Sequence, residues 1–311
     1  MNASDKKITL FSLPVIVAAL GYFVDIYDLL LFTIVKKTSM LGVGSTEATL
    51  LVDSTRVINW QMTGLLLGGI IWGVLADKKG RLSVLFGSII LYSTANFATG
   101  FVTTVDQYAW ARFIGGLGLA GELGAGITLV SELLPKNKRG VGTSMVAGIG
   151  LFGAVAAYFT YQYTQDWRLC YKIGGVLGIC LLLLRVKVAE SGMFAAAKAS
   201  EVVKGNFFML INNSKRFKKY FFAILIGLPT WYVIGILLNQ SDRFGKAMFA
   251  STTIDSGRAI MFGYVGIAIG DILIGLVSQY FKSRKKALLL FYGLTMLGLL
   301  FYFSGYNNSD T

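Results

Sequence analysis

The chain has 311 residues, of which 55% are hydrophobic and only 14% are charged, and its formal net charge is +13. About a quarter of the residues of a soluble globular domain are charged, so this composition excludes an ordinary soluble protein. The basic excess is better explained by loops on the cytoplasmic side of a membrane than by a nucleic-acid surface.

Histidine is absent from the sequence. Its absence excludes a histidine general base, a Ser–His or Cys–His nucleophile and any histidine-ligated metal. The two cysteines, Cys170 and Cys180, lie in one apolar segment and form neither a disulfide framework nor a metal site. We therefore expect neither an enzyme nor a bound cofactor or metal.

Nine apolar segments are long enough to span a bilayer, which predicts an all-α polytopic membrane protein. They cover residues 11–35, 57–76, 82–102, 106–132, 140–163, 167–186, 219–238, 259–281 and 287–304. The first segment follows Lys6 and Lys7 and is too long for the core of a signal peptide. No small-residue cleavage site follows it, so we expect a retained membrane anchor.

Most of the 29 lysines and arginines lie in alternate connecting segments. This bias predicts that the N-terminus is cytoplasmic. The lipid bilayer is then the main surrounding of the chain. Nothing in the sequence indicates nucleic acid or an obligatory protein partner.

A long polar, basic segment at 187–218 separates six spans from three. The predicted organisation is a six-helix bundle at 1–186, a cytoplasmic linker at 187–218 and a partial second bundle at 219–311. The two parts share a glycine spacing, in which Gly64, Gly68 and Gly73 recur as Gly266, Gly270 and Gly275. Such a repeat indicates related halves, so we expect three helices of a twelve-helix design to be missing.

The second and third spans are joined by a short charged loop that contains Gly73, Asp77, Gly80 and Arg81. This loop resembles the signature loop between helices 2 and 3 of the major facilitator superfamily. The resemblance implies that Asp77 and Arg81 control gating, because the family's aspartate contacts a helix of the second half on the cytoplasmic side.

Two further motifs resemble one branch of that superfamily. The run from Arg112 through four glycines to Glu122 is similar to a pattern of metabolite:proton and aromatic-acid:proton symporters. Asp25-Ile26-Tyr27-Asp28 in the first span is close to a pattern of organic-acid symporters. The fifth span lacks the Gly-Pro pair typical of drug antiporters, which favours symport.

The aspartates of the first span are candidates for proton coupling. Asp25 and Asp28 are three residues apart, so they lie on one helix face. Ionised groups are costly inside a bilayer and therefore face the bundle interior or a wet cavity. There a carboxyl group can take a proton from one side and release it to the other. The alternative is that one aspartate pairs structurally with an arginine or caps a broken helix.

Arg112 and Glu122 are ten residues apart on one predicted helix, which separates them by about 15 Å and prevents a direct pair. Arg112 could bind an organic carboxylate through two parallel hydrogen bonds, or extend to the membrane interface. Glu122 could carry a proton or contact substrate, or it could belong to a buried structural pair.

A set of residues in the second half are candidates for lining a cavity: Trp231, Tyr232, Asn239, Gln240 and Asp271. The two aromatic rings could stack on a ligand or pack into a buried face, and packing is the simpler interpretation.

Together these features predict a secondary active transporter of the bacterial inner membrane. It would move a small organic solute, an anionic metabolite or an aromatic acid, with protons by alternating access, driven by the proton gradient. The alternative is a non-transporting membrane sensor or the truncated remnant of a transporter. The absence of a Gly-rich phosphate loop gives no support to ATP-driven transport.

Overall fold

The computed structural model describes residues 12–79, 81–134, 139–190, 212–248 and 254–304. Within these ranges the regular elements are ten α-helices and one π-helical segment, which confirms the all-α prediction. They are α1 (Leu13–Gly42), α2 (Leu50–Lys79), α3 (Arg81–Thr99), α4 (Val105–Leu133), α5 (Arg139–Thr164), α6 (Trp167–Glu190), α8 (Ser214–Tyr232), η2 (Val233–Leu238), α9 (Ser241–Ala247), α10 (Ser256–Tyr280) and α11 (Arg284–Ser304).

Seven of the described helices are long and apolar enough to cross a membrane. The apolar part of α3, Ser83–Thr99, is somewhat shorter. α4 has 29 residues and is therefore about 43 Å long, more than the thickness of the hydrocarbon core. The chain is a multi-pass membrane protein.

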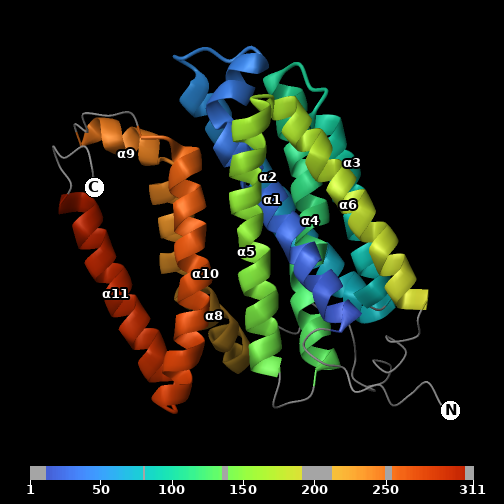
Figure 1. Cartoon of the computed structure of the whole chain (residues 1–311), viewed down its shortest axis with the longest axis vertical. Coiled ribbons are helices and arrows are strands. Elements are labelled where there is room, and N and C mark those ends of the chain that lie inside the picture. Colours follow the sequence, from blue (N-terminus) through green and yellow to red (C-terminus); the bar gives the residue numbers. More distant parts are fainter. Residues whose placement is uncertain (1–11, 80, 135–138, 191–211, 249–253, 305–311) are drawn as a thin grey trace.

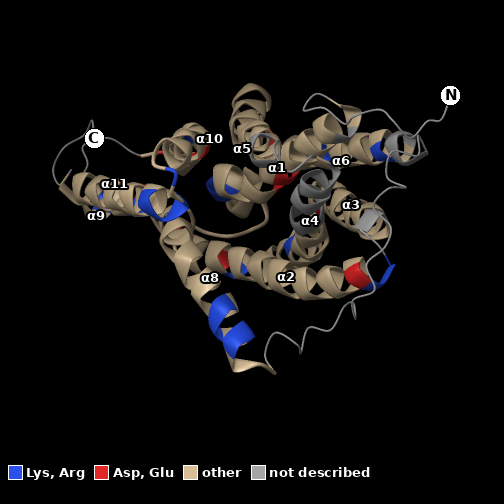
Figure 2. Cartoon of the chain, turned by 90° about the horizontal axis from the view of Figure 1, so that it is seen from below, with Lys and Arg blue, Asp and Glu red and all other residues tan. Residues whose placement is uncertain are grey.

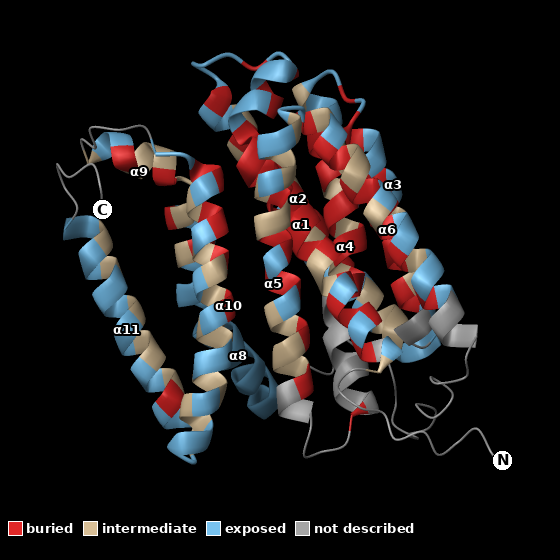
Figure 3. Cartoon of the chain, viewed as in Figure 1, coloured by how far each residue is buried: buried red, intermediate tan, exposed pale blue. Residues whose placement is uncertain are grey.

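α1 occupies the centre of a bundle formed by α1 to α6. Of its most apolar stretch, 78% is buried, the largest share of any candidate span, and it packs against α4, α5 and α6 (Figures 1 and 3). It contributes to each of the three hydrophobic clusters, through Val24, Leu31 and Val15 respectively. Most side chains in the middle of α1 are therefore buried inside the bundle.

Glycines bring the helices of this bundle into backbone contact. A side chain at Gly64 or Gly68 of α2 would collide with the backbone of Phe113 or Leu117 on α4. A side chain at Gly153 of α5 would likewise collide with the carbonyl oxygen of Phe23 on α1. Small residues permit this close packing of membrane helices.

The second set of helices is more open. α10 packs against α5 and α1, and α11 packs against α10 (Figure 1). Only 11% of the apolar stretch of Ser214–Leu238 and 6% of that of α11 are buried in the chain (Figure 3). Apolar side chains such as Leu289, Leu300 and Phe301 project outward from α11.

Several predicted boundaries are wrong. α1 continues past residue 35 to Gly42, because Lys36 finds partners on another helix instead of ending the span. α2 begins at Leu50 rather than 57. The short helix α9 was not predicted.

The basic cluster expected at the end of the linker belongs to a helix. Lys215 and Arg216 lie in the first turn of α8 (Figure 2), and their backbone N–H groups donate to the side chain of Asn213, which caps the helix. The linker predicted at 187–218 therefore overlaps α6 at one end and α8 at the other. The part at 191–211 lies outside the described residues.

The adjacent glycines Gly68 and Gly69 provide a matched test of α2–α4 packing. Gly68→Ala places a methyl group against Leu117, whereas an alanine at 69 meets nothing within 4 Å. We expect Gly68→Ala to destabilise the fold by about 1–3 kcal/mol, while Gly69→Ala is neutral or slightly stabilising. Thermal unfolding of both variants in detergent measures the difference, and equal melting temperatures would contradict the contact.

Candidate functional site

Asp25 and Asp28 lie in the middle of α1 and are each only 1% exposed. Among the described residues, the side-chain Oδ1 of Asp25 and both carboxyl oxygens of Asp28 have no hydrogen-bond partner. Buried polar atoms without partners are rare and costly. The two carboxyl groups are therefore the first candidates for a site that binds a proton or a charged group.

Arg112 lies beside Asp28 and is 1% exposed. Its Nε donates to Gln61 Oε1 at 3.3 Å, Nη1 to Asn96 Oδ1 at 2.7 Å and Nη2 to the backbone oxygen of Asp28 at 3.0 Å. Its guanidinium carbon is also 5.3 Å from the centre of the Tyr171 ring. These contacts hold Arg112 inside the bundle, so the alternative that it extends to the membrane interface is wrong.

Glu122 forms a buried ion pair with Arg185 of α6. Nη1 of Arg185 donates to Oε2 of Glu122 at 2.6 Å, and Nη2 donates to the other carboxyl oxygen. Both side chains are nearly inaccessible, with 1% and 7% of their surface exposed. Glu122 and Arg112 do not pair, as their separation on α4 predicted.

Gly21 makes room for this ion pair. A side chain at Gly21 would collide with the Arg185 guanidinium and with Glu122 Oε1. Gly21 is four residues before Asp25, so the two positions share a face of α1. The Glu122–Arg185 pair is therefore packed against the same face of α1 that carries Asp25.

The described residues of this buried acidic cluster do not balance in charge. Asp25, Asp28 and Glu122 are opposed by Arg112 and Arg185, and all five are at least 94% buried. With every group ionised, the net charge of the cluster is −1. One proton on a carboxyl group makes the cluster neutral, and a low-dielectric surrounding favours the neutral form.

Two residues of the predicted gating loop, Gly73 and Asp77, lie in the C-terminal part of α2, which continues as a helix to Lys79. Both residues are exposed. A side chain at Gly73 would meet nothing within 4 Å. Gly80 and the side chain of Arg81 lie outside the described residues.

The predicted cavity-lining residues of the second half do not form one group. Trp231 and Tyr232 are 56% and 44% exposed on α8, so neither packs into a buried face as the simpler interpretation expected. Asn239 is buried, and Gln240 is partly buried with its side-chain oxygen unpaired among the described residues. Asp271 is partly buried on α10 and interacts electrostatically with Tyr22 of α1.

A second polar contact connects α1 to the other set of helices. Lys36 Nζ donates to the backbone oxygen of Asn239 at 2.9 Å and to Asp242 Oδ1 at 3.3 Å. Asp242 also accepts from the Ser256 hydroxyl at 2.8 Å. Asn239 and Asp242, the two partners of Lys36, come directly after the π-helical segment η2 in the sequence. The π-helix is a rare conformation that is frequent at functional sites. The contact of Lys36 ties the end of α1 to α9 and α10.

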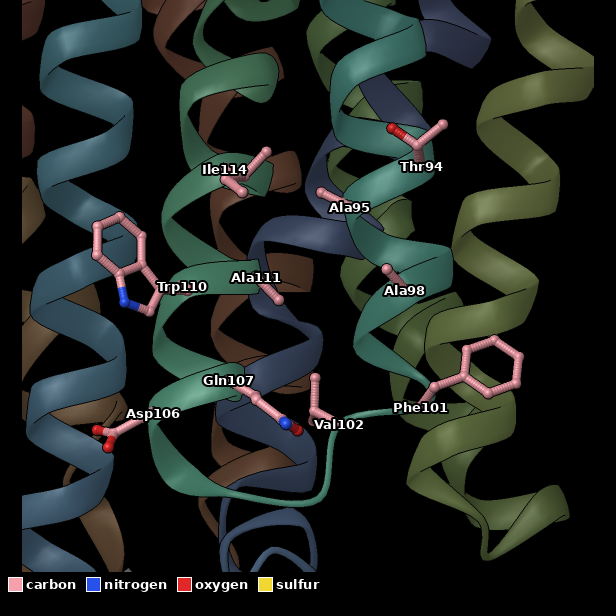
Figure 4. Close-up of a pocket in the computed structure, with 10 residues that line it drawn as sticks. All are labelled: Thr94, Ala95, Ala98, Phe101, Val102, Asp106, Gln107, Trp110, Ala111 and Ile114. Carbon is pink, nitrogen blue, oxygen red and sulfur yellow. The ribbon is translucent and has the colours of Figure 1, made fainter.

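A groove of about 680 Å³ lies between α3 and α4 (Figure 4). It is lined by Thr94, Ala95, Ala98, Phe101, Val102, Asp106, Gln107, Trp110, Ala111 and Ile114. None of the residues of the buried acidic cluster lines it. Its walls are mostly apolar and Phe101 and Trp110 are more than half exposed, so the groove opens toward the surroundings of the bundle.

Comparisons with known proteins identify the family. Residues 8–310 match the Major Facilitator Superfamily. The chain belongs to this superfamily. The resemblance seen in the sequence is thereby confirmed, including its relation to transporters of metabolites and aromatic acids.

Among the relatives, the chain is 26% identical over 324 residues to the sialic acid transporter NanX of Escherichia coli, covering 97% of this chain and 76% of NanX. It is 32% identical over 146 residues to the 4-hydroxybenzoate transporter PcaK of Pseudomonas putida, covering 46% of this chain and 33% of PcaK. The solved proton:xylose symporter XylE shares the fold, with a TM-score of 0.65 at 16% identity over 86% of this chain and 68% of XylE.

Sequence reasoning missed several partners of the site. Arg185 lies near the end of the sixth apolar segment, 167–186, and no local pattern marks it as the partner of Glu122. Gln61 and Asn96, which hold Arg112, are polar residues inside predicted spans and could have been noticed for that reason. Lys36 and Asp242 are far apart in the sequence, and no local pattern connects them.

Breaking the Glu122–Arg185 pair on one side should be more harmful than removing it entirely. Arg185→Met or Glu122→Gln leaves an unpaired buried group, which costs about 3–5 kcal/mol. The double variant removes both and should recover most of that stability. Unfolding of the four proteins in detergent gives the coupling energy. Additive losses would show that the pair is not energetically coupled.

The Asp242 contact should depend on pH. Asp242 lies outside the spans; burial opposes its charge, but Lys36 and the Ser256 hydroxyl hold the pKa of its carboxyl below the ordinary value. A lowered folded-state pKa stabilises the fold above the unfolded value of about 3.9, and this is lost as the pH falls through the folded value. We therefore expect Asp242→Asn to lower the melting temperature at pH 7 and to have little effect below the lowered pKa.

The control for this measurement is Asp106→Asn. Asp106 pairs with Arg56 at 2.7 Å, but its side chain is 68% exposed, and exposed ion pairs contribute little. This variant should melt almost as the unmodified protein does at every pH. A loss of stability in Asp242→Asn that is the same at acid and neutral pH would contradict the role of its charge.

Proposed function

We propose that this protein moves a small organic solute together with protons by alternating access, and that the solute is an anionic metabolite or an aromatic acid. The energy comes from the proton gradient, without a bound cofactor. The observation that carries the proposal is the buried acidic cluster, whose three carboxyl groups face two guanidinium groups inside the bundle.

Proton coupling follows from the charge of the cluster. Exposure to water on one side lets a carboxyl group of Asp25 or Asp28 take a proton, and the neutral cluster can then be buried again. Exposure on the other side lets the proton leave. Because Glu122 is already held by Arg185 through two hydrogen bonds, the aspartates of α1 are the better carriers of the proton.

Arg112 is the candidate group for the anionic part of the solute. Each of its terminal nitrogens donates one hydrogen bond within the chain, and each carries a second N–H that can be donated to a carboxylate. With 1% of Arg112 exposed, a solute reaches it only when the helices separate. The relatives NanX and PcaK are named for sialic acid and 4-hydroxybenzoate, which are both carboxylic acids.

Alternating access requires contacts that join the two helix sets at one end and are released when that end opens. The bonds of Lys36 to Asn239 and Asp242 are such a contact. At the other end, the loop of Gly73, Asp77, Gly80 and Arg81 takes the gating role that its resemblance implies. We place the N-terminus on the cytoplasmic side of a bacterial inner membrane. Lipid is the surrounding, and neither nucleic acid nor an obligatory protein partner is involved.

Uptake into proteoliposomes tests this proposal. Radiolabelled sialic acid and 4-hydroxybenzoate are the probes, with and without an imposed pH gradient. We expect accumulation only when the outside is acidic. Asp28→Asn should reduce gradient-driven uptake about 100-fold, the lower end of the range for a missing group in proton transfer. Glu122→Gln should also reduce it, because Arg185 loses its buried partner.

Asp106→Asn is the matched control because Asp106 is an exposed carboxyl of α4 outside the buried acidic cluster. It should accumulate solute as the unmodified protein does. Unchanged proton coupling in both Asp28→Asn and Glu122→Gln would remove the cluster from the mechanism. Uptake of a solute that does not respond to the pH gradient would refute proton symport.

A further inference from the structure

Tyr92 of α3 is a buried residue to which neither the sequence motifs nor the proposed mechanism assigns a role. It is 0% exposed, and its hydroxyl has no hydrogen-bond partner among the described residues. Two glycines hold it in place: a side chain at Gly118 of α4 would collide with its backbone nitrogen, and one at Gly178 of α6 would lie 3.1 Å from its ring. The hydroxyl is therefore kept in an apolar bundle without the partner that a buried tyrosine usually has.

Tyr92 packs in the same buried hydrophobic cluster as Val24 and Ile26, the neighbours of Asp25 on α1. Its hydroxyl group is therefore near the buried acidic cluster, close enough to Asp25, Glu122, Asp28 and Arg185 for their charges to act on it. Asp25 in turn has an unpaired Oδ1. An unused donor and an unused acceptor thus belong to the same cluster.

The other donors of the cluster are already engaged. Arg185 donates to Glu122 through both terminal nitrogens, and Arg112 donates to Gln61, Asn96 and the backbone oxygen of Asp28. The side-chain amide of Asn96 also lies close to the Asp28 carboxyl group. Asp28 thus has nearby donors of its own, whereas the remaining neutral donors near Asp25 are the hydroxyl groups of Tyr22 and Tyr92.

The groups that face Asp25 come from several helices. On α1 they are Tyr22 and Asp28, on α4 Glu122 and on α6 Arg185. Tyr22 also interacts with Asp271 of α10, so it belongs to the contact between the helix sets. On α3 the facing group is Tyr92, whose hydroxyl, unlike that of Tyr22, is fully buried and has no partner among the described residues.

We propose that the Tyr92 hydroxyl is the donor that stabilises the Asp25 carboxylate after it has released its proton. The proposal rests on proton-coupled transport as the function of the chain. When the O–H bond of Asp25 breaks, the proton leaves to water on the open side, and Tyr92 keeps its own proton and donates it as a hydrogen bond. Because the donor is neutral, Asp25 can lose and regain a proton without disturbing Arg112 or the Glu122–Arg185 pair.

Tyr92→Phe removes only the hydroxyl. Since the hydroxyl is unpaired in the structure, we expect thermal stability in detergent to be equal or slightly higher. Infrared difference spectroscopy of the purified protein follows the carboxyl C=O band, and Asp25→Asn identifies the contribution of Asp25. The loss of one hydrogen bond to a charged group corresponds to a factor of about tenfold or more, so the titration midpoint of Asp25 should rise by about one pH unit.

Transport gives a second readout. In proteoliposomes, Tyr92→Phe should slow uptake driven by a pH gradient about tenfold, and half-maximal uptake should need a more alkaline interior. Exchange of labelled for unlabelled solute, in which the proton need not be released, should proceed at the unmodified rate. 4-Hydroxybenzoate and sialic acid are the probes.

The matched control is Tyr27→Phe. Tyr27 is also a buried tyrosine, 1% exposed and next to Asp28 in the sequence, but its hydroxyl donates to the backbone oxygen of Cys170 at 3.1 Å. This variant should lose thermal stability and keep the titration of Asp25. The two substitutions thus have opposite expected effects on stability and on proton release.

An unchanged Asp25 titration in Tyr92→Phe overturns the role of Tyr92, even if the unmodified protein transports with protons. A variant that melts well below the unmodified protein shows a structural hydroxyl and also overturns it. If the unmodified protein accumulates solute without regard to the pH gradient, proton symport itself fails. The infrared titration still decides whether Tyr92 serves Asp25, because it needs no solute.

Discussion

The burial of α1 is the constraint on which the rest of the structure depends. This helix carries two aspartates into the centre of a bundle from which water is excluded, and isolated buried charges are strongly unfavourable. The surrounding helices supply two arginines that offset part of this charge. Arg112 donates to the backbone of α1 and to the side-chain amides of Gln61 and Asn96, while Arg185 neutralises Glu122. A single proton would neutralise the remaining imbalance of one charge, and this is the basis of the proton coupling that we propose.

Glycines make this arrangement possible in a second way besides bringing helices together. Gly21 leaves space for the Glu122–Arg185 pair, and a side chain at Gly174 of α6 would collide with a carboxyl oxygen of Asp28. The positions that lack side chains are thus occupied by polar groups of the facing helix. A glycine pattern that first indicates only close helix packing also determines where charged side chains are accommodated. The same glycines of the sequence thus determine both how closely the helices pack and where the charged side chains fit.

The sequence predicted the all-α fold, the family and the burial of Asp25, Asp28 and Glu122, because long apolar segments and charges inside them are local signals. It did not predict which residues of different helices contact one another. Arg185 follows an apolar run closely enough to be read as the end of a span, and only the fold shows that it meets Glu122, 63 positions away. The continuation of α1 to Gly42 depends on Lys36 finding Asn239 and Asp242. Tyr92 belongs to no sequence motif. That its hydroxyl lacks a hydrogen-bond partner among the described residues can be seen only in the folded structure.

In the mechanism that we propose, the contacts of α1 couple proton binding to movement of the helix sets. The middle of α1 carries Asp25 and Asp28, whose protonation sets the charge of the first bundle, and its end is held to α9 and α10 through Lys36. A change in the separation of the two helix sets must therefore break the bonds of Lys36 or move α1 with them. Movement of α1 displaces both aspartates relative to Arg112 and Tyr92, which belong to other helices. A coupling free energy arises when two events share one two-state element. In the mechanism that we propose that element is α1, since it carries the acids and also contacts α10 of the second set.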